Sequence, residues 1–166
     1  MIYHALGINM ISPMINTYIK PEDFLKICKN PREYLSEDIK FDHWTYSMFG
    51  RRPLGKIKDV EVLFAHSIDV EQSVRFWNKT RKWINWENLI YVLEDVHEVI
   101  PYPVVKEFCQ LTTKHLCIMG RSMYMNERLK GAIFVGQEYR VHLHIRDSAI
   151  ENWFDLLGWM NGTFEL

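Results

Sequence analysis

Apolar and polar residues recur with two periods along the chain, and these periods predict alternating strands and helices. A short apolar run at residues 60–65, bounded by charged and polar turns, is typical of a strand buried on both faces. Residues 69–83 then repeat apolar positions with the period of a helix, and Asp69 with Gln72 makes a capping-box-like start. Further strands are expected at residues 89–93, 116–119 and 132–135, and a further helix at residues 104–111. Alternating strands and helices indicate a parallel sheet.

The two ends of the chain are expected to add helices and one more strand. Pro21 suits the first turn of a helix that runs to about Lys29, and Asn30-Pro31 restarts the chain into a short helix near Leu35. Residues 139–145 alternate apolar and polar side chains, which predicts a strand at a sheet edge or in a hairpin. Residues 150–160 are amphipathic and predict a closing helix. Glycine and proline punctuate residues 50–55, so this stretch is interpreted as a loop.

Together these elements predict one α/β domain over residues 1–166, a three-layer α/β/α sandwich with a mostly parallel sheet and room for one antiparallel edge hairpin. The three cysteines form no CxxC pair and are expected to be reduced core thiols, as in cytoplasmic proteins. No apolar run reaches the roughly eighteen residues of a membrane span. A net charge of -1 argues against a nucleic-acid partner. The chain is therefore expected to be cytoplasmic, with no membrane insertion.

Ligands of open parallel sheets bind beyond the carboxyl ends of the strands, so the residues that follow each expected strand are the first candidates for a site. They are His66, Ser67 and Asp69 after one strand, Asp95 and His97 after the next, and Arg121 after the third. His66 could act as a general base, because histidine titrates near physiological pH. A cap on the following turn explains His66 equally well, and for Asp69 the helix cap is the favoured interpretation.

The segment from Trp77 to Asn88 concentrates tryptophans and charged residues. Trp77 lies on the buried stripe of the expected helix and should be core, whereas Trp86 is the best candidate for an exposed platform that stacks on a sugar ring. Arg81 also falls on the sheet-facing side of that helix. A partly buried ion pair with Asp59, at the start of the preceding strand, is the simplest account of it.

No metal site and no cofactor site is predicted. His142 and His144 lie two apart on one strand face, a spacing that can bind a metal ion, but Arg140 and Arg146 on the same face would repel a cation. A solvated edge is therefore favoured. The sequence has neither a Gly-x-Gly-x-x-Gly loop nor a P-loop, so a dinucleotide or nucleoside triphosphate has no cradle and the cofactor is left unassigned.

A set of residues spread over the chain resembles one bacterial family. The matching positions are Ser12-Pro13, Asn16, Pro21-Glu-Asp23-Phe24, Tyr34-Leu35, Asp59-Val60 through Phe64, His66, Trp77, Arg81, Ile84-Asn85 and Asn88. From about Tyr3 to Asn161 the chain is similar to a domain of unknown function that is often labelled exopolysaccharide biosynthesis protein. Members lie in capsule and exopolysaccharide gene clusters and are believed to have a three-layer α/β fold. The family's first strand would precede Met1, which implies an open sheet edge and predicts a homodimer.

The resemblance implies a cytoplasmic protein of bacterial exopolysaccharide or capsule biosynthesis that transfers or modifies a sugar or glycan precursor, such as a nucleotide-sugar. The candidate catalytic residues are then Ser12, His66 and Asp95, and the candidate substrate-binding residues are Asn16, Ser67, His97, Arg121 and Trp86. No local motif supports a Ser-His-Asp triad among them. The alternative is a non-catalytic protein that binds a glycan precursor or acts as scaffold of a polysaccharide synthesis complex.

Overall fold

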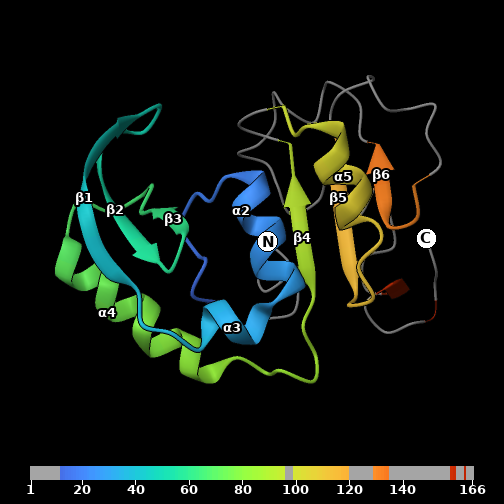
Figure 1. Ribbon diagram of the computed structural model, residues 1–166, viewed down its shortest axis with the longest axis horizontal. Helices are drawn as coiled ribbons and strands as arrows, with labels where there is room; N and C mark the ends of the chain where they lie inside the picture. The colour runs from blue at the N-terminus through green and yellow to red at the C-terminus, as the bar shows by residue number, and fades with distance from the viewer. Residues whose placement is uncertain (1–11, 96–98, 120–128, 135–157, 160–162, 164–166) are drawn as a thin grey trace. The chain divides into compact units, whose positions relative to one another are not determined.

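The computed structural model describes residues 12–95, 99–119, 129–134, 158–159 and 163, which fall into two compact units (Figure 1). One unit comprises residues 10–89, and the other comprises residues 90–166 together with residues 1–9. Each unit has its own three-stranded sheet in the described residues. The predicted strand at residues 139–145 lies outside the described residues, and of the predicted helix at residues 150–160 only Gly158 and Trp159 are described, both helical. The expectation of a single domain stays a prediction.

Two short helices open the unit of residues 10–89, as predicted. Helix α2 spans Pro21–Lys29 and α3 spans Pro31–Leu35, and each has proline in its first turn, where a missing N–H leaves no hydrogen bond unmade. Acidic residues lie in the first turn of α2 and basic residues in its last, which suits the helix dipole. Leu25, Ile27 and Cys28 face inward and are buried.

The sheet of this unit is antiparallel, which contradicts the predicted α/β/α sandwich with a mostly parallel sheet. Its strands are β1 (Lys40–Ser47), β2 (Gly50–Ile57) and β3 (Val60–Leu63), in the order β1-β2-β3. The apolar run at residues 60–65 was expected to be a central parallel strand, but β3 instead pairs antiparallel with β2. The prediction failed because β1 is exposed along most of its length and carries no buried alternation, so two strands were not recognised.

Helix α4 (Val70–Thr80), followed by a 3-10 turn at Arg81–Trp83, runs alongside this sheet (Figure 1). Trp77 is fully buried, as predicted, and joins a core cluster contributed by α2, α3, α4 and the sheet. Gly55 of β2 makes this packing possible: a Cβ there would lie 2.6 Å from Cδ1 of Ile39 and 3.1 Å from Cε2 of Phe64. The sheet can approach its neighbours closely only because that position has no side chain.

The predicted ion pair between Asp59 and Arg81 is wrong. Asp59 accepts hydrogen bonds from Lys26 Nζ and from the Tyr34 hydroxyl, each at 3.0 Å. Arg81 donates to Asp38 Oδ1 from Nε at 2.9 Å and to the Ser36 carbonyl from Nη1 at 2.8 Å. The prediction assumed a parallel crossover, which would return the end of the helix to the start of β3. In the antiparallel arrangement, the end of α4 lies instead against the loop between α3 and β1.

The second unit retains the predicted order of strand, helix and strand. Strands β4 (Tyr91–Glu94), β5 (His115–Met119) and β6 (Ala132–Phe134) form a parallel sheet in the order β4-β5-β6, and α5 (Tyr102–Phe108) connects the first two. Leu93 opposes Cys117 in the β4–β5 register. Phe108 of α5 is fully buried, so α5 contributes to the core of this unit. The expectation of parallel βαβ structure is therefore confirmed here, on a smaller scale than predicted.

All three cysteines, Cys28, Cys109 and Cys117, are buried and unlinked, which confirms their predicted place in the core. Burial raises the pKa of the Cys28 thiol well above its ordinary value. Across the described part of the chain, none of the helices combines the length and apolar character that a membrane span requires.

Candidate functional site

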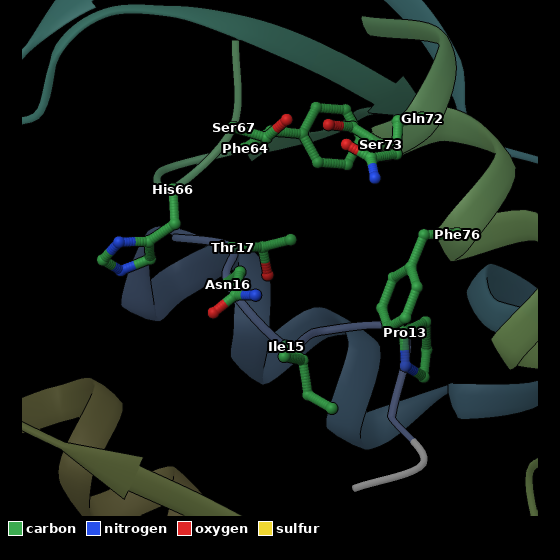
Figure 2. Close-up of a pocket in the computed structure, with 10 residues that line it drawn as sticks. All are labelled: Pro13, Ile15, Asn16, Thr17, Phe64, His66, Ser67, Gln72, Ser73 and Phe76. Atoms are coloured by element: carbon green, nitrogen blue, oxygen red, sulfur yellow. The ribbon is translucent and has the colours of Figure 1, made fainter. Parts of the chain in front are cut away.

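One hollow in the unit of residues 10–89 brings together several of the residues selected from the sequence. Its volume is about 230 Å³. It lies between the loop that precedes α2, the segment that follows β3 and the first turns of α4 (Figure 2). The lining residues are Pro13, Ile15, Asn16, Thr17, Phe64, His66, Ser67, Gln72, Ser73 and Phe76. Three of the predicted site residues, Asn16, His66 and Ser67, are therefore neighbours in space.

The loop at residues 12–17 is held by its own hydrogen bonds and by β3. The Met14 N–H donates to Ser12 Oγ at 3.3 Å, and the Thr17 hydroxyl donates to the Met14 carbonyl at 2.7 Å. Tyr18 then exchanges two backbone hydrogen bonds with Leu63, at 2.8 and 2.9 Å. These contacts fix the loop beside the end of β3, which places its polar side chains near His66.

Asn16 has a backbone conformation that points to a specific role. Its φ is 60°, in the left-handed region that asparagine tolerates better than most residues. Its side-chain amide hydrogen-bonds no described residue. Unusual backbone conformations in ordered structure gather at ligand-binding sites, because the surrounding contacts must hold them in place. An amide held at the hollow with its donors and acceptor open to a ligand is therefore suited to binding.

Asp69 caps α4, as predicted. Its Oδ1 accepts from the Gln72 N–H at 2.9 Å, and its carbonyl accepts from the Ser73 hydroxyl at 2.7 Å. Ser67 Oγ accepts in turn from the Asp69 N–H at 3.1 Å. The Asp69 carboxylate thus already occupies the N-terminus of α4, where the helix dipole would otherwise favour an anionic ligand. This part of the hollow is better suited to a neutral ligand.

His66 is exposed at one end of the hollow, opposite Phe76 and Pro13 (Figure 2). Its ring contacts that of Phe49, with centroids 5.8 Å apart, and its imidazole hydrogen-bonds no described residue. Ser67 and Asp69, rather than His66, therefore cap the turn that follows β3. Among the described residues, none that lines the hollow carries a carboxylate that could orient the imidazole.

The polar lining residues are an imidazole, two amides and three hydroxyl groups, and the apolar walls come from two phenylalanines, a proline and an isoleucine. Amides and hydroxyls both donate and accept hydrogen bonds, as the hydroxyls of a polyol do. Apolar walls with a few polar groups are typical of small-molecule sites. The arrangement can hold a small neutral ligand that has polar edges and one apolar face.

Two other predicted catalytic residues lie elsewhere. Ser12 begins the loop beside Pro13 but does not line the hollow. Asp95 belongs to the other unit, where it follows β4 and is only 3% exposed; its N–H donates to the Ile118 carbonyl at 3.2 Å. It therefore stands at the carboxyl end of a parallel strand, as expected. A joint site for His66 and Asp95 stays a prediction.

Of the remaining predicted substrate-binding residues, Trp86 is half-buried, packs against the core cluster and has the Arg32 guanidinium 4.9 Å from the centroid of its ring. His97 and Arg121 lie outside the described residues, and so do His142 and His144. Within the described ranges, no three His, Cys, Asp or Glu side chains are grouped so that they could hold a metal ion.

Thr17, Gln72 and Phe76 line the hollow but were not selected as site residues. Gln72 was recognised only as part of the helix cap. Phe76 lies about two turns after the Asp69 cap and about 100° around the helix from the buried Trp77, and it is 41% exposed. The sequence signal that could have selected Phe76 as a site residue is an aromatic side chain outside the apolar stripe of a predicted amphipathic helix.

Comparison with known proteins shows a family and a bacterial relative. Residues 1–161 match a family described as a domain of unknown function (DUF1919). An uncharacterized protein of Haemophilus influenzae is 27% identical over 123 residues, which is 74% of this chain and 57% of the relative. The chain thus spans a little over half of the length of that relative. Neither description names exopolysaccharide or capsule.

Proposed function

We propose that this chain, which belongs to the DUF1919 family, binds a sugar unit of a glycan precursor in the hollow beside His66, during cytoplasmic assembly of bacterial exopolysaccharide or capsule. The process is suggested by the resemblance to capsule and exopolysaccharide proteins. The molecular role is supported by one observation: residues from separate parts of the sequence, one selected as catalytic and two as substrate-binding, line the same hollow. Those residues are Asn16, His66 and Ser67.

The hollow suits a sugar in size and in chemistry. A volume of about 230 Å³ lies below the roughly 300–1,000 Å³ of typical drug-sized pockets, so one pyranose ring is a better match than a whole nucleotide-sugar. Asn16, Gln72 and His66 offer donors and acceptors to the ring hydroxyls. Phe76, which is 41% exposed, offers a flat apolar surface to the C–H face of the ring.

Transfer or modification of the bound sugar is the second candidate function. Its support is His66, whose imidazole is exposed at the hollow and could remove a proton from an attacking hydroxyl. Asp95, the other candidate, is a buried carboxyl group at the carboxyl end of β4 in the other unit. Binding without catalysis is favoured because the lining of the hollow supplies no carboxylate to orient the imidazole.

A thermal-shift screen against monosaccharides, nucleotide-sugars and short glycans tests the binding role. A ligand present at about 100 times its Kd stabilises the folded state by about 2.7 kcal/mol, which is readily measured as a rise in Tm. His66→Ala should abolish most of this rise, and so should Asn16→Gly. Glycine keeps the left-handed backbone of residue 16 without strain, so the Asn16→Gly result isolates the amide.

His43→Ala is the matched control, because His43 is also an exposed histidine of this unit but does not line the hollow. It should keep the full ligand response. All three variants should have an unliganded Tm within a few degrees of the wild type, since exposed side chains contribute little to stability. An undiminished response in His66→Ala and Asn16→Gly would contradict the proposed site.

The two candidate roles are separated by turnover. The protein is incubated with the best nucleotide-sugar and a hydroxyl acceptor, and release of the nucleotide is followed. Sustained release that is lost in both His66→Ala and Asp95→Asn would establish transfer as the function. Binding without release, at protein concentrations that saturate the ligand, would establish the non-catalytic role.

A further inference from the structure

The hairpin of β1 and β2 exposes aromatic side chains that no core contact explains. Phe41 is 40% exposed, Trp44 is 38% exposed and Tyr46 is 82% exposed. Every residue of β1 is exposed or half-exposed. Single exposed apolar residues are common on protein surfaces, but several large ones on a single strand indicate an interaction surface.

A bulge in β1 places these three aromatic residues on the same face of the sheet. The register between β1 and β2 shifts between Phe41 and His43, so that Asp42 is an extra residue without a partner. The Cα partners of Phe41, Trp44 and Tyr46 are Gly55, Pro53 and Arg51, which alternate along β2 and therefore share a face. The rings of Phe41 and Trp44 meet edge to face at 6.2 Å. Arg51 lies 4.8 Å from the centroid of Trp44. We call Phe41, Trp44, Tyr46 and Arg51 the aromatic face.

The charge of the hairpin favours an anionic partner. Residues 40–57 contain four basic residues against one acidic residue, although the whole chain has a net charge of -1. The basic residues are Lys40, Arg51, Arg52 and Lys56, and the acidic one is Asp42. Asp42 Oδ2 is hydrogen-bonded to His43 Nδ1 at 2.6 Å. By the β1–β2 register, only Arg51 lies on the aromatic face, whereas Lys40, Arg52 and Lys56 lie on the opposite face of the hairpin. The hairpin as a whole carries an excess of positive charge, which attracts anions at moderate ionic strength.

The hairpin turn packs onto the protein through Phe49, whose ring lies 6.3 Å from that of Tyr18 and 5.8 Å from that of His66. Met48, beside it in the turn, is 66% exposed. Flat aromatic faces in a row suit an extended ligand with repeated apolar surfaces.

The aromatic face and the hollow lie on the same side of the sheet. Gly55 opposes Phe41, so their Cα–Cβ directions point to the same face. On that face, a Cβ at Gly55 would lie 3.1 Å from Cε2 of Phe64, and Phe64 lines the hollow. Phe49 also connects the hairpin turn to His66 at the end of the hollow. The hairpin therefore touches two residues of the hollow, Phe64 at Gly55 and His66 through Phe49.

We propose that the aromatic face binds an acidic oligosaccharide, whose sugar rings stack on Trp44 and Tyr46 and whose carboxylate or phosphate groups are attracted by Arg51. This inference rests on the proposed function, because it extends the ligand in the hollow from one sugar unit to a chain. It names the substrate class: a charged polymer or its lipid-free fragment, rather than an isolated nucleotide-sugar.

The test measures Kd by isothermal titration calorimetry with a hexamer of galacturonic acid, and with maltohexaose as the neutral probe. The acidic hexamer should bind more tightly, and its affinity should fall as salt is raised. Trp44→Ala and Tyr46→Ala should each weaken it by about tenfold or more, the range that stacking on aromatic side chains provides. Tyr46 is so exposed that its loss leaves folding intact, which keeps the test valid if Trp44→Ala is unstable.

Trp83→Ala is the matched control. Trp83 is 53% exposed and has Lys79 5.2 Å from its ring centroid, so it resembles Trp44 with Arg51 but belongs to the turn after α4. Its loss should leave the affinity for the hexamer unchanged. Equal weakening by Trp83→Ala and Trp44→Ala would show non-specific aromatic binding and would overturn the proposal.

Failure of this inference and failure of the proposed function give different results. If His66→Ala abolishes binding of single sugars while Tyr46→Ala and Trp44→Ala leave the hexamer affinity unchanged, the hollow stands and the aromatic face is refuted. If the face variants weaken the hexamer while His66→Ala and Asn16→Gly change no sugar affinity, the face stands and the hollow is refuted. Tighter binding of oligothymidylate or of phosphatidylglycerol vesicles than of the hexamer would assign the face to another anionic partner and refute the proposal.

Discussion

At the scale of one residue, Asp59 has hydrogen-bond partners in the fold, but they are Lys26 and Tyr34 and not the predicted Arg81. Its carboxylate accepts from Lys26 Nζ and from the Tyr34 hydroxyl, and Lys26 also binds Asp23 Oδ1 at 2.7 Å. The hydrogen bond from Lys26, and then that from Tyr34, lowers the pKa of Asp59 below its ordinary value. The folded state therefore holds this carboxyl group in its charged form more firmly than the unfolded chain does.

A lowered pKa makes stability depend on pH in a definite direction. The contribution of Asp59 is present above the ordinary pKa of an aspartate, about 4, and is lost as pH falls through the lower pKa of the folded state. Asp59→Asn should therefore reduce the fall in the free energy of unfolding between about pH 5 and pH 2. Urea denaturation at several pH values measures this slope.

Tyr34→Phe provides the graded comparison, since it removes one of the two donors and leaves Lys26 in place. Its pH slope should lie between those of the wild type and Asp59→Asn. Identical slopes in all three proteins would show that the Asp59 carboxylate is not held in the folded state.

At the scale of the element, the segment from Trp77 to Arg81 has a structural role. Trp77 fills the core, and Asn78 makes two hydrogen bonds to the backbone of Ile39: Oδ1 accepts from the N–H at 2.8 Å, and Nδ2 donates to the carbonyl at 3.2 Å. Arg81 binds the Ser36 carbonyl one turn later. These side chains attach α4 to the segment that precedes β1. The unusual combination of residues is therefore explained by the packing of this unit.

Asn78→Ala should accordingly destabilise the fold without affecting ligand binding. The substitution leaves the N–H and C=O of buried Ile39 without their side-chain partner, which costs about 1–3 kcal/mol in the free energy of unfolding. Chemical denaturation measures the loss. Lys82→Ala is the control, because Lys82 is exposed on the adjoining turn and interacts with no described residue.

A loss in Asn78→Ala no larger than that in Lys82→Ala would refute the structural role of this asparagine. Retained sugar binding by folded Asn78→Ala would separate the segment from the hollow. Lost binding in a fully folded variant would instead give Asn78 a part in positioning the ligand.

The strands β1 and β2 show why sequence patterns missed two of the three strands of one sheet. A strand with one buried face alternates apolar and polar residues, but β1 exposes both kinds and has a bulge at Asp42 that breaks the alternation. Gly50 and Gly55, which favoured a loop, have separate structural uses: Gly50 has a φ of 82° after the turn, and Gly55 makes room for Ile39. The same residues that punctuate loops also permit tight turns and close packing.

At the scale of the whole molecule, the burial of every cysteine makes a prediction for both units at once. Thiolates react with disulfide reagents, and access requires exposure. Burial raises the pKa of Cys28, and the hydrogen bond with Cys109 raises that of Cys117. We expect none of the thiols to react with Ellman's reagent at the rate of free cysteine in the native protein, and all three to react in denaturant. A fast native thiol would show that one of the two units opens.

The sequence by itself determined the features that depend on neighbours along the chain. Helices α2, α3 and α4, the Asp69 cap, the burial of Trp77 and the βαβ order around α5 all follow from local propensity and periodicity. Asn16, His66 and Ser67 were selected without knowledge of their contact. The resemblance predicted a family of unknown function, which the match over residues 1–161 shows, while the exopolysaccharide label stays a prediction.

Only the tertiary structure decided how the elements pair. Whether β3 is a parallel or an antiparallel strand depends on its pairing with β2. Because the residues of β2 are partly exposed and partly buried without regular alternation, its sequence does not show a strand pattern. That choice moved the end of α4, replaced the partner of Arg81 and brought the loop of Asn16 to the end of β3. Backbone pairing between distant segments is specified by the fit of the whole core, and a local pattern cannot contain it.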